Sequence, residues 1–217
     1  MVNENKIKPM INKSIRGALR ESYDLNAQKR DSAVTEEWKI EERSKLSSLF
    51  QQEDKRSLLE IGSGPGRDSK FFQDQGFEVV CIDLSPEMVK ICRQKGLAAQ
   101  VMDMADLQFP ASSFDAVYSL NSLLHLSKAE FPTVLSRINE IMKPSGLFYL
   151  GMYGGHDFEG VWEDDTYTPK RFFSYYSDDH IQQLVATVFD ILSFYHIMTS
   201  RQSNLHFQSL ILRKRNK

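Results

Sequence analysis

A glycine-rich turn that directly follows a short apolar run constrains this chain more than any other feature. The run Ser57-Leu58-Leu59-Glu60-Ile61 is typical of a buried strand, and Gly62-Ser63-Gly64-Pro65-Gly66 ends it. Helical spacing begins again near Arg67. Glycines in such a turn let the backbone approach a ligand closely, and the helix start presents free amides. The feature predicts an α/β fold with a nucleotide-type site at the end of this strand.

Strand and helix patterns alternate along the rest of the chain. Strands are predicted at residues 77–83, 98–102, 114–120 and 147–150, and two helical patterns precede the first strand. Strands that alternate with helices indicate a mostly parallel sheet covered on both faces. The last two predicted strands, 191–198 and 205–212, are joined by a short connection, which favours an antiparallel hairpin.

The composition excludes several classes of function. The 217 residues carry 27 basic and 29 acidic side chains, a net charge of −2, so no overall field attracts nucleic acid. No segment is long and apolar enough for a membrane span or a signal peptide. Cys81 and Cys92 lie in apolar patterns typical of buried thiols, and no cluster has metal-ligand spacing. We therefore expect a cytoplasmic protein with no nucleic-acid partner, no membrane contact and no metal.

The spacing of the glycines separates two classes of α/β enzyme. A nicotinamide-binding oxidoreductase needs G-x-G-x-x-G, whereas this chain has Gly62, Gly64 and Gly66. With Leu59-Glu60-Ile61 before it, this turn resembles the first motif of the class I S-adenosylmethionine (SAM)-dependent methyltransferases. The resemblance spans residues 20–212 and continues in order through four further elements: Asp83, 102–105, 114–121 and 143–147. It implies a Rossmann-like fold of seven strands in the order 3-2-1-4-5-7-6, with strand 7 antiparallel.

The same resemblance implies SAM as the cofactor. Asp83 closes the second strand, where its two oxygens can accept hydrogen bonds from both ribose hydroxyls, and Asp103 matches the turn beside the adenine. Other interpretations stay open: Asp83 as a helix cap, Asp103 as a solvated loop residue, Glu60 as a support for the turn and Trp38 as core packing. The predicted cofactor residues are Tyr23, Arg30, Trp38, Glu60, Gly62, Ser63, Gly64, Gly66, Asp83, Leu84, Ser85, Met88, Asp103, Met104, Ala105, Leu120, Asn121 and His125.

Methyl transfer from an activated sulfonium needs alignment and exclusion of water, and a base only where the acceptor must lose a proton. His125 follows the fourth strand by a few residues and is the first candidate for that base. Tyr153 and His156 follow the fifth strand and are weaker candidates. The alternative for His125 is a histidine that packs against the loop or touches only the cofactor.

The acceptor site is expected in the stretch 151–176, where the family places substrate-binding insertions. A helical lid at residues 14–52 and a flexible start at 1–13 complete the single domain predicted for 1–217. Glu159, Glu163, Asp164 and Asp165 favour a cationic or amine-bearing acceptor, whereas an ordinary ordered loop is the alternative for the whole stretch. The predicted substrate residues are Tyr23, Tyr153, Trp162, Tyr167, Arg171, Phe172 and Tyr175.

The residues after the fourth strand narrow the reaction. Asn121-Ser122-Leu123-Leu124 lacks the Asn/Asp-Pro-Pro-aromatic pattern that accompanies methylation of adenine or glutamine amino groups. Neither cysteine is placed as the nucleophile that cytosine C5 methylation requires. The sequence predicts a SAM-dependent methyltransferase of a small organic acceptor. A protein or peptide methyltransferase and a SAM-binding protein without activity remain as alternatives, and the methylated atom and the oligomeric state are open.

Overall fold

The computed structural model describes residues 4–199 and 205–215, and it places side chains from residue 14 onward. Its elements follow the alternation that the sequence predicted. In chain order they are α1 (Glu4–Leu25), α2 (Ala27–Ser32), α3 (Glu37–Gln52), β1 (Ser57–Ile61), α4 (Arg67–Asp74), β2 (Glu78–Asp83), α5 (Pro86–Gln94), β3 (Ala98–Val101), β4 (Phe114–Leu120), the 3-10 turn η1 (Leu123–His125), α6 (Phe131–Ile141), β5 (Met142–Gly154), β6 (Phe158–Val161), β7 (Phe172–Tyr175), α7 (Asp178–Val185), β8 (Phe189–Ile197) and β9 (His206–Lys214).

The seven-stranded sheet has the predicted order. Its strands run β3-β2-β1-β4-β5-β9-β8, and the first five are parallel to one another. β9 is antiparallel to both β5 and β8, so it corresponds to the antiparallel strand 7 of the prediction. Because β1 lies between β2 and β4, the chain reverses its direction of winding there, and ligands bind at such a switch point.

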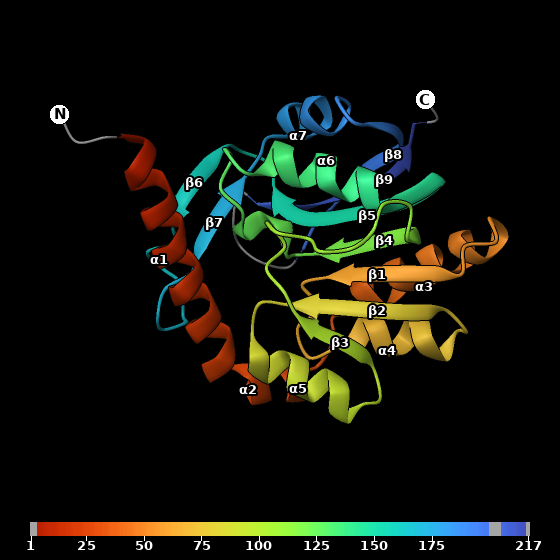
Figure 1. The fold of residues 1–217 in the computed structure, drawn as a ribbon, viewed down its shortest axis with the longest axis horizontal. Coiled ribbons are helices and arrows are strands. Elements are labelled where there is room, and N and C mark those ends of the chain that lie inside the picture. The colour runs from red at the N-terminus through yellow and green to blue at the C-terminus, as the bar shows by residue number, and fades with distance from the viewer. Residues whose placement is uncertain (1–3, 200–204, 216–217) are drawn as a thin grey trace.

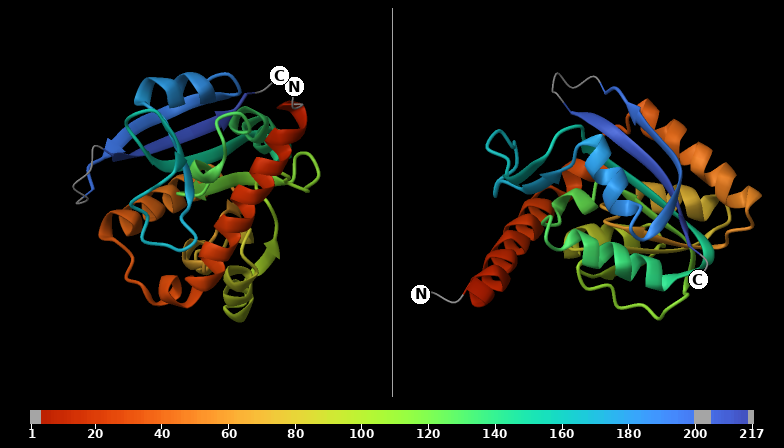
Figure 2. Two further views of the ribbon diagram at one scale, coloured as in Figure 1. Left: turned by 90° about the vertical axis from the view of Figure 1, so that its left-hand side faces the viewer. Right: turned by 90° about the horizontal axis from the view of Figure 1, so that it is seen from above.

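Helices cover both faces of the sheet. α3 and α4 lie on one face and α6 and α7 on the other (Figures 1 and 2). The apolar run of β1 is buried on both sides, as expected of a central parallel strand. The apolar stripe of α6 is fully turned to the core, through Phe131, Val134, Leu135, Ile138 and Ile141.

Helix α1 lies across the end of the sheet toward which β1, β2 and β4 point (Figure 1). The helix begins at Glu4, although a flexible segment was expected over 1–13; residues 1–3 of that expectation lie outside the described residues. Arg16 holds α1 in place through ion pairs to Asp103 (Nε–Oδ2 2.5 Å) and Glu130 (Nη2–Oε1 2.6 Å). The helix is thereby fixed over the carboxyl ends of the strands.

The stretch 151–176 is more regular than its sequence indicated. β5 continues to Gly154, and β6 and β7 form a separate antiparallel hairpin beside α1 (Figure 1). Both strands have only four residues and Gly160 interrupts the first, so no period of two was visible in the sequence. Among the described helices, none combines the length and the apolar character required to cross a membrane.

Candidate active site

The glycine turn adopts a backbone that side chains would disturb. Gly62 has a φ of 73°, and a Cβ there would lie 2.2 Å from the Cβ of Ser122. Gly64 also has a positive φ, 53°, but an added Cβ would meet nothing within 4 Å. The turn is therefore pressed against the loop after β4 on one side and faces open space at Gly64, where a ligand can approach the backbone.

Asp83 lies beside this open space. Its carboxylate accepts hydrogen bonds from the amides of Gly64 (2.8 Å) and Ser85 (2.9 Å), one on each oxygen. Burial raises the pKa of Asp83 above its ordinary value, while the two amides stabilise the charged form. Each carboxylate oxygen has a second lone pair, so the side chain can also accept two ribose hydroxyls. The donor and acceptor set of this turn fits the nucleoside part of SAM.

The remaining residues predicted around the nucleoside occupy three kinds of position. Asp103 is not a solvated loop residue: it accepts from the Ala105 amide (2.9 Å) and pairs with Arg16 of α1. Ser85 caps α5 and donates to Asp24 (2.5 Å), so it links α5 to α1. Four other members are half-buried around the same edge of the sheet, namely Leu84, Met104, Ala105 and Leu120. Three more are buried in the packing below this edge, namely Ser63, Gly66 and Met88.

Two predicted cofactor residues have structural positions instead. Glu60 is buried and accepts a hydrogen bond from Ser69 in α4, and burial together with nearby Asp68 raises its pKa well above the ordinary value. Trp38 packs on Phe207 of β9, with ring centroids 4.5 Å apart, and does not line the cavity described next. For both residues the structure supports the alternative interpretation, that Glu60 orders the turn and that Trp38 belongs to the core.

A cavity of about 480 Å³ opens at the carboxyl ends of β4 and β5. Asn121 and His125 line it from the loop after β4, and Tyr153 lines it from β5. Asn121 has a positive φ of 54°, and within the described residues its buried Oδ1 has no hydrogen-bond partner. A strained backbone and an unused acceptor at a cavity wall are typical of a ligand site.

The second half of the cavity comes from α1, α2 and the connection between β6 and β7. Six of the seven residues predicted to bind substrate line the cavity together with Arg30, namely Tyr23, Tyr153, Trp162, Tyr167, Arg171 and Tyr175. Asp164, Asp165 and Phe173 of the predicted acceptor segment line it as well. Sequence reasoning missed Lys39, Leu124, Thr166 and Leu205, which also line the cavity.

His125 is held in one tautomer. Its Nδ1 lies 2.7 Å from the carbonyl oxygen of Phe172, which can only accept, so Nδ1 carries the proton. The Tyr23 hydroxyl then donates to Nε2 at 2.6 Å. Burial lowers the pKa of His125 to about 3, and the charges of Arg171 and Arg30 lower it as well. The imidazole is therefore neutral at physiological pH.

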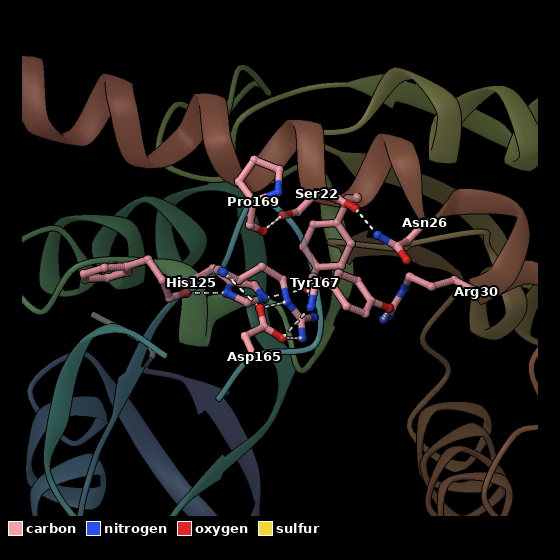
Figure 3. A network of polar contacts seen from close by, with 10 residues as sticks. Ser22, Asn26, Arg30, His125, Asp165, Tyr167 and Pro169 are labelled. Carbon is pink, nitrogen blue, oxygen red and sulfur yellow. Dashed lines mark hydrogen bonds and ion pairs between the residues drawn. The ribbon is translucent and has the colours of Figure 1, made fainter. Parts of the chain in front are cut away.

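A chain of polar contacts fastens α1 and α2 to the β6–β7 connection (Figure 3). Arg171 forms two hydrogen bonds to Asp165, Nε–Oδ2 at 2.8 Å and Nη2–Oδ1 at 2.7 Å, and its guanidinium lies 3.8 Å from the centre of the Tyr167 ring. The same guanidinium donates to the Tyr23 hydroxyl at 3.3 Å. Arg30 of α2 donates to the Tyr167 hydroxyl at 3.4 Å. These contacts close the cavity on the side away from the sheet.

Two of the residues predicted for catalysis or substrate binding lie outside the cavity. His156 is exposed beyond the end of β5, 6.0 Å from the Tyr175 ring, so it is not a member of this site. Phe172 is buried, and it acts through its carbonyl, which orients His125, instead of through its ring. Both residues follow Gly154, where β5 ends and the chain leaves the seven-stranded sheet to form the separate β6–β7 hairpin.

Most of the acidic residues of 151–176 have an ion-pair or hydrogen-bond partner on the protein. Asp165 pairs with Arg171, Glu163 pairs with Lys170 at 2.8 Å, and Glu159 accepts from the Lys128 amide at 2.7 Å. Of the four acids that suggested a cationic acceptor, Asp164 alone lines the cavity without an ion pair among the described residues. Arg30 lines the same cavity, and its buried Nε has no hydrogen-bond partner among the described residues. The cationic or amine-bearing acceptor stays a prediction.

Known proteins with similar sequences and folds fit this geometry. Residues 59–150 match the family model described as a methyltransferase domain. A protein of Geobacillus sp. (strain WCH70), assigned by name to the methyltransferases, is 30% identical over 148 residues, which are 64% of this chain and 58% of that protein. The ubiquinone biosynthesis O-methyltransferase of Xanthomonas oryzae pv. oryzae is 34% identical over 103 residues, or 43% of this chain and 41% of the relative.

A solved structure shows the same fold over nearly the whole chain. The 1,6-didemethyltoxoflavin-N1-methyltransferase of Burkholderia thailandensis, crystallised with its substrate and S-adenosylhomocysteine, superposes with a TM-score of 0.69 at 20% identity. The match covers 91% of this chain and 88% of the solved one. The chain spans less than two thirds of the curated relatives named above. Residues 59–150 therefore match a methyltransferase domain, and the chain as a whole has the fold of a solved SAM-dependent methyltransferase.

Proposed function

We propose that this protein transfers a methyl group from SAM to a small organic acceptor bound in the 480 Å³ cavity. One observation carries the proposal: the cavity is lined by Asn121, Tyr23 and Arg30, whose charge acts on the half-buried Asp83, and it continues into the aromatic β6–β7 connection. Its volume suits a small molecule, and α1 covers it from outside. The toxoflavin and ubiquinone enzymes named above also act on small organic molecules, according to their names, which supports the assignment.

Asp83, the amide-lined turn at Gly64 and Asn121 would hold the cofactor. SAM supplies an already activated methyl group, so the protein needs no nucleophile of its own. Arg30 lies close enough to Asp83 to stabilise its charge, and its unpaired Nε is available to a carboxylate at the other end of the ligand. α1 and α2 cover the site that these residues form, and this cover excludes water from the reacting atoms.

His125 serves as a positioning residue in this proposal instead of a general base. With a pKa of about 3 the buried imidazole accepts a proton poorly, and its Nε2 already accepts the Tyr23 hydroxyl. The imidazole instead fixes the direction of the Tyr23 hydroxyl at the cavity wall. Tyr23 and Tyr153 are then the hydroxyl groups available to orient the acceptor.

Calorimetry with SAM and S-adenosylhomocysteine tests cofactor binding. Asp83→Ala removes two acceptor atoms for ribose hydroxyls, each hydrogen bond to a charged group contributing about 1.5–3 kcal/mol, so affinity falls at least roughly tenfold to hundredfold. Asp83→Asn keeps the size and one acceptor, and circular dichroism checks that both variants fold. Asp157→Ala, at an exposed ion pair with Lys128, is the control that leaves binding unchanged. Equal affinity in wild type and Asp83→Ala contradicts the assigned site.

Turnover separates the enzyme from its alternatives. The protein is incubated with methyl-labelled SAM and panels of small organic acceptors and basic peptides. Label in a small molecule supports the proposal, and label in peptides alone favours a protein methyltransferase. SAM binding without transfer to any acceptor leaves the non-catalytic interpretation. The cytoplasmic location and the lack of a nucleic-acid partner stay predictions from the sequence.

A further inference from the structure

Three potential metal ligands meet behind the wall of the cavity. Asp178 begins α7, His196 lies on β8 and His206 begins β9. One ligand atom of each side chain can be chosen so that all three atoms lie within 4.8 Å of one another. α7 lies beside the β8–β9 hairpin (Figure 1), and Asp178 contacts His206 near the end of the hairpin where the two strands are joined.

The carboxylate of Asp178 is already oriented toward the histidines. His206 Nε2 lies 2.7 Å from Asp178 Oδ1, and the side-chain amide of Gln208 donates to the same oxygen at 2.8 Å. Gln208 is buried and also donates to the carbonyl oxygen of Tyr176 (3.0 Å). A carboxylate fixed by a buried amide is typical of a metal ligand whose outer partner sets its direction.

The two imidazoles lie on the same side of the hairpin. Their ring centroids are 5.0 Å apart and their planes are tilted by 48°, so the rings are not stacked on each other. His196 is exposed and therefore free to rotate, while His206 and Asp178 are half-buried. An ion can approach the cluster from the exposed side of His196.

We propose that Asp178, His196 and His206 bind a divalent transition-metal ion such as Zn²⁺. Two imidazoles with one carboxylate suit Zn²⁺ and its neighbours, whereas Ca²⁺ and Mg²⁺ prefer sites made of oxygen alone. Ligand bonds of about 2.0–2.2 Å in tetrahedral geometry separate ligand atoms by about 3.3 Å. Small rotations of the three side chains bring the observed spacing of 2.7 to 4.8 Å to that value. Water completes the fourth position.

The ion would join α7 to the β8–β9 hairpin at the back of the acceptor cavity. Leu205 directly precedes His206 and lines the cavity, and Tyr175, three residues before Asp178, lines it as well. The proposed role is structural, because the ligands themselves do not line the cavity. The sequence predicted no metal since the three residues are 18 and 10 positions apart, which matches no short ligand motif.

Metal titration of the full chain, free of any affinity tag, tests the site. Calorimetry with Zn²⁺ is expected to show one ion per chain, and Co²⁺ to give the visible absorption of a histidine-bound ion. His196→Gln and His206→Gln each lower the Zn²⁺ affinity at least about tenfold, because the loss of even an outer partner of a ligand costs about 10–100-fold. The exposed position of His196 ensures that its variant folds. In wild type, Zn²⁺ also raises the midpoint of thermal unfolding.

His180→Gln is the matched control. His180 lies on α7 two residues after Asp178, but its Nδ1 contacts Asp157 at 2.7 Å and takes no part in the cluster. This variant keeps wild-type affinity for Zn²⁺. The proposal is overturned if wild type binds no stoichiometric Zn²⁺, or if affinity survives in His196→Gln and His206→Gln. SAM affinity measured on the same samples reports separately on the proposed function.

Discussion

At the scale of single residues, burial decides which chemistry a side chain can perform. His125 stands where a general base was expected, yet it is enclosed between the Phe172 carbonyl and the Tyr23 hydroxyl. A buried imidazole without a carboxylate partner loses its affinity for protons, so its pKa falls to about 3. The residue keeps its place at the site, and its role changes from proton transfer to orientation.

This shift in pKa predicts how stability depends on pH. The unfolded chain protonates His125 below about pH 6.5, while the folded chain does so only near pH 3. The unfolded state therefore binds more protons between these values, and stability present above pH 6.5 is lost as the pH falls toward 3. At pH 5 the loss from this residue is about 2 kcal/mol. Urea unfolding of wild type and His125→Gln at pH 8 and pH 5 measures it.

The His125→Gln variant should lack this part of the acid destabilisation. The difference at pH 8, where the imidazole is neutral in both states, gives the cost of the substitution that does not depend on pH. An equal loss of stability between pH 8 and pH 5 in both proteins would show that His125 titrates normally in the folded state.

Sequence reasoning at this scale reaches the contacts that neighbours in the chain determine. Asp83 closes a strand beside a glycine turn, and its bonds to Gly64 and Ser85 follow from that register, while its hold on the ribose stays a prediction. The Arg16–Asp103 pair was missed, since its partners lie 87 positions apart and meet only through the placement of α1. Contacts of that kind depend on the packing of elements, which no local pattern encodes.

At the scale of elements, α3 shows how one polar residue can belong to an apolar stripe. Its residues at intervals of four lie on one face, and these are Trp38, Glu42, Leu46 and Phe50. The structure buries Glu42, whose carboxylate accepts from Tyr195 (2.7 Å), Ser209 (2.9 Å) and Tyr149 (3.4 Å). The helix is thereby bound to β5, β8 and β9 by hydrogen bonds as well as by apolar contact.

Glu42→Ala should lower the free energy of unfolding by about 2–3 kcal/mol, because it leaves buried hydroxyls without an acceptor. Glu41→Ala is the matched control, since Glu41 is the preceding residue on the same helix and is exposed. Its effect stays within about 0.5 kcal/mol. Chemical denaturation of the three proteins makes the comparison. Equal stabilities for the two variants would mean that water replaces the carboxylate at no cost.

The β6–β7 connection offers a second comparison between a buried and an exposed ion pair. Arg171 and Asp165 are 15% and 4% exposed, whereas Lys170 and Glu163 are 43% and 83% exposed. Asp165→Ala leaves a largely buried guanidinium unpaired and should cost roughly 3 kcal/mol. Glu163→Ala should have no measurable effect, because solvent screens that pair. Urea unfolding, together with amide exchange over residues 162–173, distinguishes global from local loss.

A loss confined to amide exchange would place the ion pair in the docking of the connection instead of in global folding. Unchanged amide exchange and unchanged stability in Asp165→Ala would show that the Arg171–Asp165 ion pair does not hold the β6–β7 connection in place. The hairpin itself was not predicted, because strands of four residues give too few positions for a period of two.

At the scale of the whole molecule, the sheet order followed from the sequence because each βα unit carried its own pattern. Apolar runs such as 57–61, a cap at Ser85 and a stripe over 131–141 specify elements locally, and right-handed crossovers then restrict the topology. A lid at residues 14–52 was predicted from the resemblance alone, since the pattern of α1 shows only which face of the helix is apolar. What it covers depends on partners from three separate segments.

This arrangement predicts a global response to the cofactor product. α1 closes over the site through Tyr23, and α5 is joined to α1 by the Ser85–Asp24 hydrogen bond. A ligand that binds the folded chain alone stabilises it by about 2.7 kcal/mol at a concentration one hundred times its Kd. S-adenosylhomocysteine should therefore raise the midpoint of thermal unfolding and slow amide exchange in the glycine turn and in residues 14–32. Hydrogen-exchange mass spectrometry measures both segments.

Two controls make this last outcome specific. The β8–β9 hairpin lies at the far edge of the sheet order, so its exchange should change less than that of α1. Asp83→Asn, with its weaker hold on the ribose, should need more ligand for the same protection. Slowed exchange in the glycine turn without any change over residues 14–32 would show that α1 packs on the sheet independently of the ligand. The helix would then be a fixed wall of the cavity and not a lid.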